Sequence, residues 1–571
     1  MLFIFWRKYF AESLSYREQL QLFENTWIYF RKHLLFQGGL VVYLSEFFIQ
    51  FFKFSILGVL IASALLMCLY YATFSFLEQV STNRLNILFS FLPVFAYTLL
   101  LTNELYSLAG VFAFIITLLF ARLFVCIKNF KKRYLAGIVL IILLYWFAGG
   151  AFIILGLLMV LSELIKSDKN ALGRNLIFSV LLLSGMILIP LFARQFLFHD
   201  TLLQSYLSSA YYKVPVLFPL ELKIVFLLFP AIVILSYLTK KLKLLSDSFK
   251  SLSSLILVLL VWCVLILATS HSETEIARYY GNMVYTENWD EIIAEAENGF
   301  PDNDEIHLAI NLALAKQGKL TSHFFSIDNL KPVFHLPYQR RGMTPLIASD
   351  PYYHAGLINF SQMYAAESVS STIDQKMPVR SAIRLAQTYV LNGQFSIAEK
   401  YLNKLKNSLF YRKWAKQTLQ LIAAGEEELL KYDEWNTKKQ FMLKEDFYYN
   451  KDQLHLAMIF LLRSNQSNHF AFEYLMLHLL LEKDFDSFLN YLRYYRNMEY
   501  VETPLYFEQA LAYIETLRPG IIDAYSFVEV SESTIQHIQR YAMLYHTNNE
   551  NDREKLKAEY ANTYWYYLHF K

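Results

Sequence analysis

The stretch SILGVLIASALLMCLYYATF, residues 55–74, contains no acidic or basic side chain, and it decides the class of fold. A helix of about 20 apolar residues spans the hydrocarbon core of a bilayer and satisfies its own backbone hydrogen bonds. Further apolar runs, separated by short polar or basic breaks, continue to residue 269. The sequence therefore predicts an all-α protein with a polytopic transmembrane helical domain over residues 54–269.

The expected spans are short, and their ends are approximate. Gly149 and Gly150 leave open whether two of them form one broken helix. Residues 1–10 are apolar but too short to cross a bilayer, so residues 1–53 are interpreted as a truncated first span, or an interfacial anchor, followed by a first outer loop. The approximate bounds of the spans are 55–74, 86–101, 105–127, 134–146, 151–165, 175–192, 223–238 and 252–269.

Basic residues in the loops predict the orientation of these spans. Lys and Arg are frequent in the loops 128–133, 166–174 and 240–250, which all fall on one side of the expected spans. An excess of Lys and Arg in short loops is typical of the cytoplasmic face. The first loop and everything after residue 270 then lie on the opposite face. We expect a multi-pass protein of the cell inner membrane with an extracytoplasmic C-terminal domain.

Composition excludes several classes of protein. The formal net charge of +3 is close to balance, whereas a nucleic-acid-binding protein needs a concentrated basic face. Nucleic acid is therefore not an expected partner. The three cysteines, Cys68, Cys126 and Cys263, all lie in apolar runs, so they offer neither a disulfide framework nor a cysteine metal site.

The second half, residues 270–571, has the apolar periodicity of helices and no run long enough to span a bilayer. The window LAQTYVLNGQFSIAEKY, residues 385–401, resembles the core of a tetratricopeptide repeat, with weaker echoes at 281–296, 311–320 and 472–488. We therefore expect a TPR-like solenoid, whose concave surface could bind a peptide or an envelope protein. A packed helical core without a ligand is the alternative.

Candidate functional residues gather on the outer face. Arg17, Glu18 and Glu24 lie in the first loop, before an aromatic stretch over residues 44–54 that predicts a helix in the membrane interface. Three further charged residues lie in the other outer loops: Glu104, Arg194 and Lys213. A carboxylate held near an apolar interface is desolvated, which raises its basicity and suits proton abstraction.

This arrangement of a first loop with an acidic residue, an interfacial helix, many short spans and an extracytoplasmic C-terminal domain resembles the GT-C superfamily of membrane glycosyltransferases, which use polyprenyl-phosphate sugars. The first loop also looks like that of an uncharacterised bacterial membrane family with tetratricopeptide-like C-termini. That second resemblance rests on the strings Arg-Glu-Gln-x-x-Leu-Phe and Gly-Gly-Leu-x-x-Tyr-x-x-Glu-Phe-x-x-Gln-Phe, between Arg17 and Phe51.

The GT-C resemblance implies roles for individual residues. Glu18, and second Glu24, would be the general base that activates the acceptor hydroxyl. Arg17, Arg194 and Lys213 would bind the phosphate of a lipid-linked sugar donor. Glu104 would support the acceptor or a divalent cation, although no set of metal ligands is assigned.

Other interpretations stay open. Glu18 and Glu24 are also explained as solvated residues or as partners of Arg17 and Arg31, and Glu104 as a simple turn cap. The whole chain could instead be a non-enzymatic, membrane-anchored scaffold whose solenoid binds envelope proteins. A transporter is disfavoured, because no expected span carries a charge at mid-membrane.

Overall fold

The computed structural model is all-α, as the sequence predicts. It describes residues 1–571 except 167–171, 199–200, 208, 215–216, 243–255, 259, 263, 265–271, 337–343, 375, 444–452 and 547–549. Over the described residues there is no β-strand, and one isolated antiparallel bridge joins Tyr106 to Tyr212.

The chain divides into two compact units. The first consists of Met1–Glu275 together with two later segments, Thr372–Val379 and Lys404–Arg412. The second contains Ile276–Ser371, Arg380–Asn403 and Lys413–Lys571. Composition predicts a single boundary near residue 270. It does not indicate that two later segments belong to the first unit.

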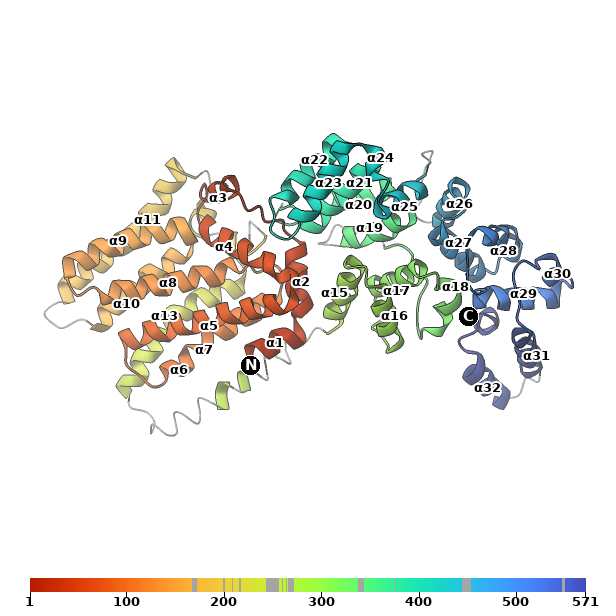
Figure 1. Ribbon diagram of the computed structural model, residues 1–571. Coiled ribbons are helices and arrows are strands. Elements are labelled where there is room, and N and C mark those ends of the chain that lie inside the picture. Colours follow the sequence, from red (N-terminus) through yellow and green to blue (C-terminus); the bar gives the residue numbers. More distant parts are fainter. Residues whose placement is uncertain are drawn as a thin grey trace. The chain divides into compact units, whose positions relative to one another are not determined.

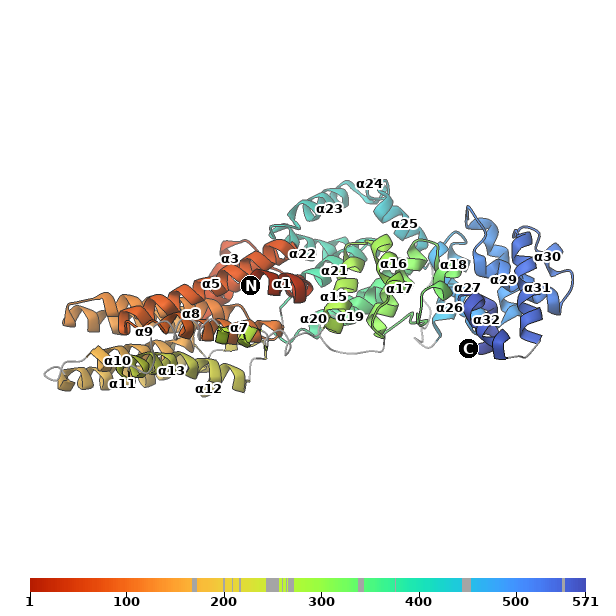
Figure 2. The same cartoon turned by 90° about the horizontal axis from the view of Figure 1, so that it is seen from below.

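The first unit is a helical bundle that begins with short helices corresponding to the expected first loop. Figures 1 and 2 both show its longer helices, α5, α8, α9, α10, α11 and α13, lying alongside one another. The elements are α1 (Leu2–Tyr9), α2 (Ala11–Gln19), α3 (Trp27–His33), α4 (Gly39–Ile49), η1 (Gln50–Lys53), α5 (Ser55–Val80), α6 (Asn86–Phe89), α7 (Phe91–Thr102), α8 (Ala109–Cys126), α9 (Phe130–Ala148), α10 (Ala151–Lys166), α11 (Leu172–Phe196), α12 (Leu202–Tyr206), η3 (Ser209–Tyr211) and α13 (Leu220–Leu242).

Within the described part of the first unit, four helices are long and apolar enough to cross a membrane. They are Ser55–Val80, Ala109–Cys126, Gly173–Phe196 and Leu220–Lys240. The other expected spans that the structure describes also fall on helices, namely α6 with α7, α9 and α10. The last expected span, 252–269, lies largely outside the described residues, as do Lys169, Lys243 and Lys250, which contribute to the predicted orientation. That orientation stays a prediction.

A break separates α9 from α10 at the glycine pair of the sequence. Gly149 has a positive φ of 60°, and α10 starts anew at Ala151. The Tyr211 hydroxyl bridges the break, because it donates to the Ala148 carbonyl and accepts from the Ala151 N–H at 3.2 Å. Polar backbone groups freed at the break are thereby hydrogen-bonded, as burial requires.

The second unit consists of shorter helices that follow one another as packed pairs. Figure 2 shows α17, α18, α27 and α29 as neighbours in this unit. Its elements are α15 (Ser272–Tyr285), α16 (Trp289–Glu297), α17 (Asp304–Lys316), α18 (Leu320–His323), η4 (Phe324–Ser326), α19 (Thr344–Ala355), α20 (Ile358–Ser370), α21 (Val379–Leu391), α22 (Phe395–Lys406), α23 (Arg412–Ala424), α24 (Glu426–Leu429), α25 (Asp433–Phe441), α26 (Leu454–Ser464), α27 (His469–Leu481), α28 (Phe485–Leu492), η6 (Arg493–Asn497), α29 (Leu505–Leu517), α30 (Ile521–Ala524), α31 (Glu532–His546), α32 (Glu550–Tyr560) and α33 (Tyr564–Phe570).

One turn recurs in the second unit, in the four windows that the sequence singled out. Each first helix ends in a Schellman motif, in which the residue after the left-handed position donates its N–H five residues back, at 2.8–3.0 Å. The left-handed residues are Glu287 (φ 56°), Gly318 (65°), Gly393 (69°) and Lys483 (59°). The unit is thus built in part from similar helix pairs. Its relation to the tetratricopeptide family stays a prediction.

Candidate functional site

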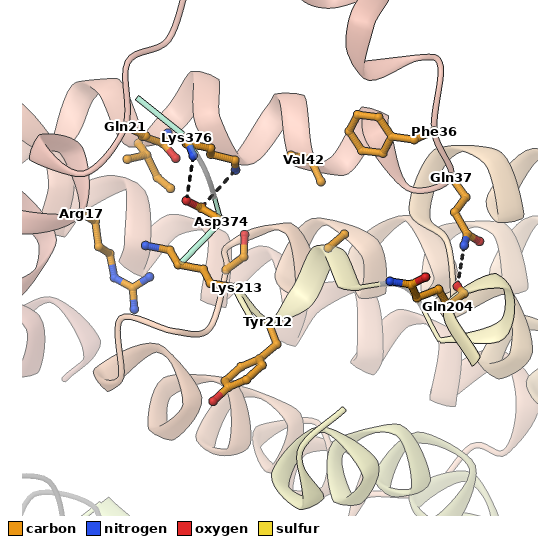
Figure 3. Close-up of a pocket in the computed structure, with 13 residues that line it drawn as sticks. Arg17, Gln21, Phe36, Gln37, Val42, Gln204, Tyr212, Lys213, Asp374 and Lys376 are labelled. Atoms are coloured by element: carbon orange, nitrogen blue, oxygen red, sulfur yellow. Dashed lines mark hydrogen bonds and ion pairs between the residues drawn. The ribbon is translucent and has the colours of Figure 1, made fainter. Parts of the chain in front are cut away.

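The first unit contains a partly open cavity of about 370 Å³ that combines cations, amides and apolar side chains. Figure 3 shows Arg17, Lys213, Asp374 and Lys376 gathered at one end, and Gln37 with Gln204 at the other. The Gln37 side-chain N–H donates to the Gln204 carbonyl at 2.5 Å. The complete lining is Arg17, Gln21, Phe36, Gln37, Val42, Ile49, Ser107, Gln204, Ala210, Tyr212, Lys213, Asp374 and Lys376.

Arg17, on α2, holds the turn that follows α7. Its guanidinium donates to the carbonyls of Leu101, Asn103 and Tyr106 at 2.7–2.8 Å, and its side chain is 3% exposed. Carbonyls at the end of a helix have no partner within it and carry partial negative charge, which a cation stabilises. Arg17 is therefore fixed in position and brings a buried positive charge to the cavity.

Lys213 lines the same cavity, and the isolated bridge between Tyr106 and Tyr212 holds it there. Its N–H donates to the Leu105 carbonyl at 2.8 Å, and the Ser107 N–H donates to the Tyr211 carbonyl at 3.0 Å. Burial lowers the pKa of Lys213 to about 8; the charge of Asp374 opposes this shift, and the charges of Arg17 and Lys376 add to it. Three cations crowded into one partly desolvated space repel one another, and an anion placed there would relieve the repulsion.

The glycine pair Gly38-Gly39 lets α4 fold back against α3. Gly38 has a φ of 74°, and a Cβ on Gly39 would lie 1.6 Å from the carbonyl oxygen of His33. Only glycine allows this approach of two backbones. As a result His33, at the end of α3, lies beside Glu46 on α4, with 2.9 Å between Nε2 and the carboxylate.

Glu46 is the best-paired carboxylate of the site. It is 2% exposed, accepts from the Tyr29 hydroxyl at 2.7 Å and forms an ion pair with Lys376 at 2.6 Å. Burial alone would raise the pKa of Glu46, but Lys376 and His33 outweigh it and lower the pKa to about 2. Glu46 is therefore ionised, and it holds the ammonium group of Lys376 in place.

Lys376 and Asp374 come from the segment Thr372–Val379, far along the chain from the other lining residues. The Leu22 N–H donates to the Met377 carbonyl at 2.8 Å, which ties this segment to the first loop. The Lys376 ammonium lies 3.7 Å from the Asp374 carboxylate, besides its closer contact with Glu46. Asp374 is the one carboxylate among the described lining residues.

Glu18 lies one residue after Arg17 on α2 but is not among the residues that line the cavity. It is 3% exposed, and its carboxylate accepts from the Tyr411 hydroxyl at 2.9 Å, with the Lys53 ammonium 4.0 Å from the Tyr411 ring. Burial raises the pKa of Glu18 to about 7, although Tyr411 and Lys53 act to lower it. The carboxyl group therefore titrates near neutral pH.

The structure brings together only some of the residues that the sequence proposed. Arg17 and Lys213 line the cavity, and Glu104, partly buried in the turn between them, raises the pKa of Lys213. Glu24 follows α2 and is partly exposed, and Arg194 is exposed near the end of α11. Neither lines the cavity. The catalytic and binding roles suggested for these residues stay predictions.

Sequence reasoning missed Glu46, Asp374, Lys376 and Tyr411. Glu46 stood in the quoted first-loop string, so its position was visible but its partners were not. The other three lie in short stretches between helices of the C-terminal half, where nothing in the local pattern connects them to the first loop. Only the tertiary fold does so.

No group of three or more His, Cys, Asp or Glu side chains arranged to hold a metal ion occurs among the residues that the structure describes. The divalent cation suggested by the resemblance thus has no ligand set to test here.

Comparison with known families gives one result that covers the full chain. Residues 1–571 match a family of unknown function, DUF6057. The chain belongs to this family. No curated protein and no solved structure matches it. For this DUF6057 member, function has to be inferred from the residues of the cavity themselves.

Proposed function

We propose that this chain is a membrane glycosyltransferase that binds the phosphate of a lipid-linked sugar in the cavity of the first unit. One observation carries the proposal: Arg17, Lys213 and Lys376 line a single space of about 370 Å³, in which Asp374 is the one carboxylate among the described lining residues. Such a surplus of cations suits a phosphate group, and Lys and Arg are its usual protein ligands.

The three cations would act differently. Arg17 already donates to three carbonyls, so it contributes mainly its charge. Lys376 is held by Glu46 at 2.6 Å, whereas no carboxylate of the described residues pairs with Lys213 within 4.0 Å. Lys213 is therefore the cation most available to a ligand. Because phosphate would raise its pKa from about 8, binding above neutral pH should take up a proton.

The neutral lining suits a sugar, and the bundle suits a lipid tail. Gln21, Gln37, Ser107, Gln204 and Tyr212 provide hydrogen-bonding groups of the kind that sugar hydroxyls need. The four long apolar helices belong to the same unit as the cavity. A polyprenyl chain lying against such helices would leave its phosphate in the polar cavity.

The reaction is a displacement at the anomeric carbon of the donor sugar. The acceptor oxygen forms the new glycosidic bond, the bond from carbon to phosphate oxygen breaks, and the lipid phosphate leaves with the electron pair. The acceptor proton goes to a carboxylate. Asp374 is the one carboxylate among the described lining residues, so we assign it this role in preference to Glu18, which lies outside the lining.

Binding and transfer are tested separately in nanodiscs. Polyprenyl phosphate should bind wild type, and Lys213→Met should weaken binding at least about tenfold, since a charge-assisted bond contributes about 1.5–3 kcal/mol. Lys223→Met, an exposed lysine on α13 outside the lining, is the matched control. Asp374→Asn should bind polyprenyl phosphate normally but abolish transfer from a radiolabelled polyprenyl-phosphate sugar. Equal binding by wild type and the Lys213→Met/Lys376→Met double variant would refute the proposal.

A second candidate is a membrane-anchored scaffold for envelope proteins. The observation in its favour is the recurring helix pair of the second unit, with the same turn at four positions. In a deletion strain, a scaffold needs no chemistry, so Asp374→Asn should restore the wild-type phenotype fully. If the chain is an enzyme, that variant should not restore the phenotype.

A further inference from the structure

The second unit contains its own polar cavity, of about 450 Å³, formed by residues from several of its helices. Two lysines, two buried ring side chains and exposed carboxylates line it. Its charged and ring side chains include Glu287, Lys316, Tyr353, His354, Glu434 and Lys438.

Lys438, on α25, lies at the centre of this group. Its ammonium donates to His354 Nδ1 at 3.2 Å and lies 4.6 Å from the centre of the Tyr353 ring. Accepting this bond requires Nδ1 of His354 to be unprotonated. Burial, followed by the charges of Lys438 and Lys316, lowers the pKa of His354 well below its usual value, which agrees with a neutral ring.

Among the described residues, the cavity lysines have no carboxylate as an ion-pair partner. Ion pairs of the second unit occupy Lys331, Arg380, Arg384, Lys431 and other cations, but within the described residues none includes Lys316 or Lys438. Burial lowers the pKa of Lys438 strongly, Lys316 adds to the effect, and Glu287 and Glu434 oppose it. The lysines and the carboxylates are therefore close enough to interact electrostatically, but among the described residues they form no ion pair with each other.

Glu287 occupies this cavity at a conformational cost. It is the left-handed residue of the turn between α15 and α16, at φ 56°, where the equivalent turns after α17 and α21 have Gly318 and Gly393. A left-handed non-glycine residue costs about 1–2 kcal/mol. Residues that keep such strain are concentrated at functional sites. Here the strained residue places a carboxylate on the cavity wall.

We propose that this cavity binds a small zwitterion of the α-amino-acid class, either a free amino acid or a short peptide. Its carboxylate would bind Lys316 and Lys438, and its ammonium group would bind Glu287 and Glu434, with the Tyr353 ring alongside. A simple anion would meet the carboxylates, and a simple cation would meet the lysines. The volume lies within the range of about 300–1,000 Å³ that is usual for small-molecule sites.

Calorimetry on the full chain in detergent micelles tests this proposal with L-alanine and L-alanyl-L-alanine. At least one should bind saturably with one site per chain. N-acetylation, which removes the ammonium group, and amidation, which removes the carboxylate, should each weaken binding at least about tenfold. Equal binding of the blocked compounds, or tighter binding of acetate or inorganic phosphate, would overturn it. So would the absence of saturable binding by both probes at millimolar concentration.

Two variant pairs locate the site. Lys438→Met should weaken binding at least about tenfold, while Lys431→Met, an exposed lysine outside the cavity, should not. Glu287→Gly should remove binding and leave the melting temperature unchanged or higher, because glycine relieves the left-handed strain. Lys483→Gly makes the same change at the equivalent turn outside the cavity, and should leave binding intact. If Lys438→Met does not fold, the exposed Lys316→Met replaces it; normal binding by a folded lysine variant contradicts the proposal.

Discussion

Helices α11 and α27 are both almost entirely apolar, yet they lie in opposite surroundings. On α11, in the first unit, Ile177, Ile187 and Leu188 are 74%, 57% and 61% exposed. On α27, in the second unit, Leu475 and Leu477 are fully buried. Their neighbours come from α17, α18, α26 and α28 of the same unit.

The difference shows that apolar composition does not by itself identify a membrane helix. A helix that is apolar all round is a core helix if other helices surround it, and needs lipid if they do not. Length separates the two here, since α11 has 25 residues and α27 has 13. The exposed apolar face of α11 favours a membrane location for the first unit.

The units also bury carboxylates in different ways. Glu46, in the first unit, forms an ion pair with Lys376 and lies 2.9 Å from the His33 ring. Glu473, in the second, accepts from neutral groups among the described residues, including the N–H and hydroxyl of Thr321 at 2.9 and 3.0 Å and the hydroxyl of Tyr500. Burial raises the pKa of Glu473 despite these bonds, whereas the pKa of Glu46 is about 2.

The largest effect should come from placing a charge on each apolar helix. Leu475→Lys should destabilise the second unit by about 4 kcal/mol or more, because an unpaired charge is buried there. Ile187→Lys should leave the unfolding free energy in detergent nearly unchanged, yet weaken membrane insertion by about 2.5–3.5 kcal/mol. Denaturation in micelles and carbonate extraction of membranes measure the two effects. Equal loss of folding in both variants would abolish the contrast.

Removing the paired carboxylate tests the second difference. The folded-state pKa of Glu46 is depressed, so its contribution is present above about pH 4.5 and is lost as the pH falls toward about 2. Glu46→Gln should therefore lower the unfolding free energy near pH 7 by about 3 kcal/mol. Glu473→Gln should instead increase the unfolding free energy at neutral and alkaline pH, because a carboxyl group with a raised pKa destabilises the fold once it ionises. Denaturant titrations from pH 3 to 8 distinguish these signs.

Glu18 should behave like Glu473 although it belongs to the first unit. Its pKa of about 7 means that stability falls as the pH rises from about 4.5 to about 7. Glu18→Gln should remove this slope and gain up to about 3 kcal/mol at pH 8. Melting temperatures against pH provide the measurement. A slope that is unchanged in the variant would show that another group is responsible.

The smallest effects concern the recurring turn of the second unit. Gly393→Ala should lower the unfolding free energy by about 1 kcal/mol, although a Cβ there would meet no atom within 4 Å. Lys483→Gly should raise it by a similar amount at most. Chemical denaturation of both variants measures these changes in unfolding free energy. A loss of stability on Lys483→Gly would mean that the Lys483 side chain, which donates to the Leu568 carbonyl at 2.9 Å, outweighs the strain.

Much of the fold could be predicted because it depends on local pattern. The apolar runs gave the helices from α5 to α13, and the Leu385–Tyr401 window gave the turn at Gly393, since helix length and a left-handed glycine are properties of neighbouring residues. The site could be predicted only in part. Arg17 and Lys213 stand out in polar stretches between apolar runs, but the pairing of Lys376 with Glu46 joins residues 330 positions apart, which no local rule detects.

The two later segments of the first unit have a consequence for how the molecule can be cut. A fragment ending at residue 275 would keep the four long apolar helices of the first unit but would lose Asp374, Lys376 and Tyr411. The buried carboxylate of Glu46 would then lack its ion pair with Lys376, and that of Glu18 would lack its hydrogen bond from Tyr411. Expression of the hydrophobic half alone should therefore give a protein that enters membranes with its cavity unfinished, and supplying the remaining half as a second polypeptide would have to restore it.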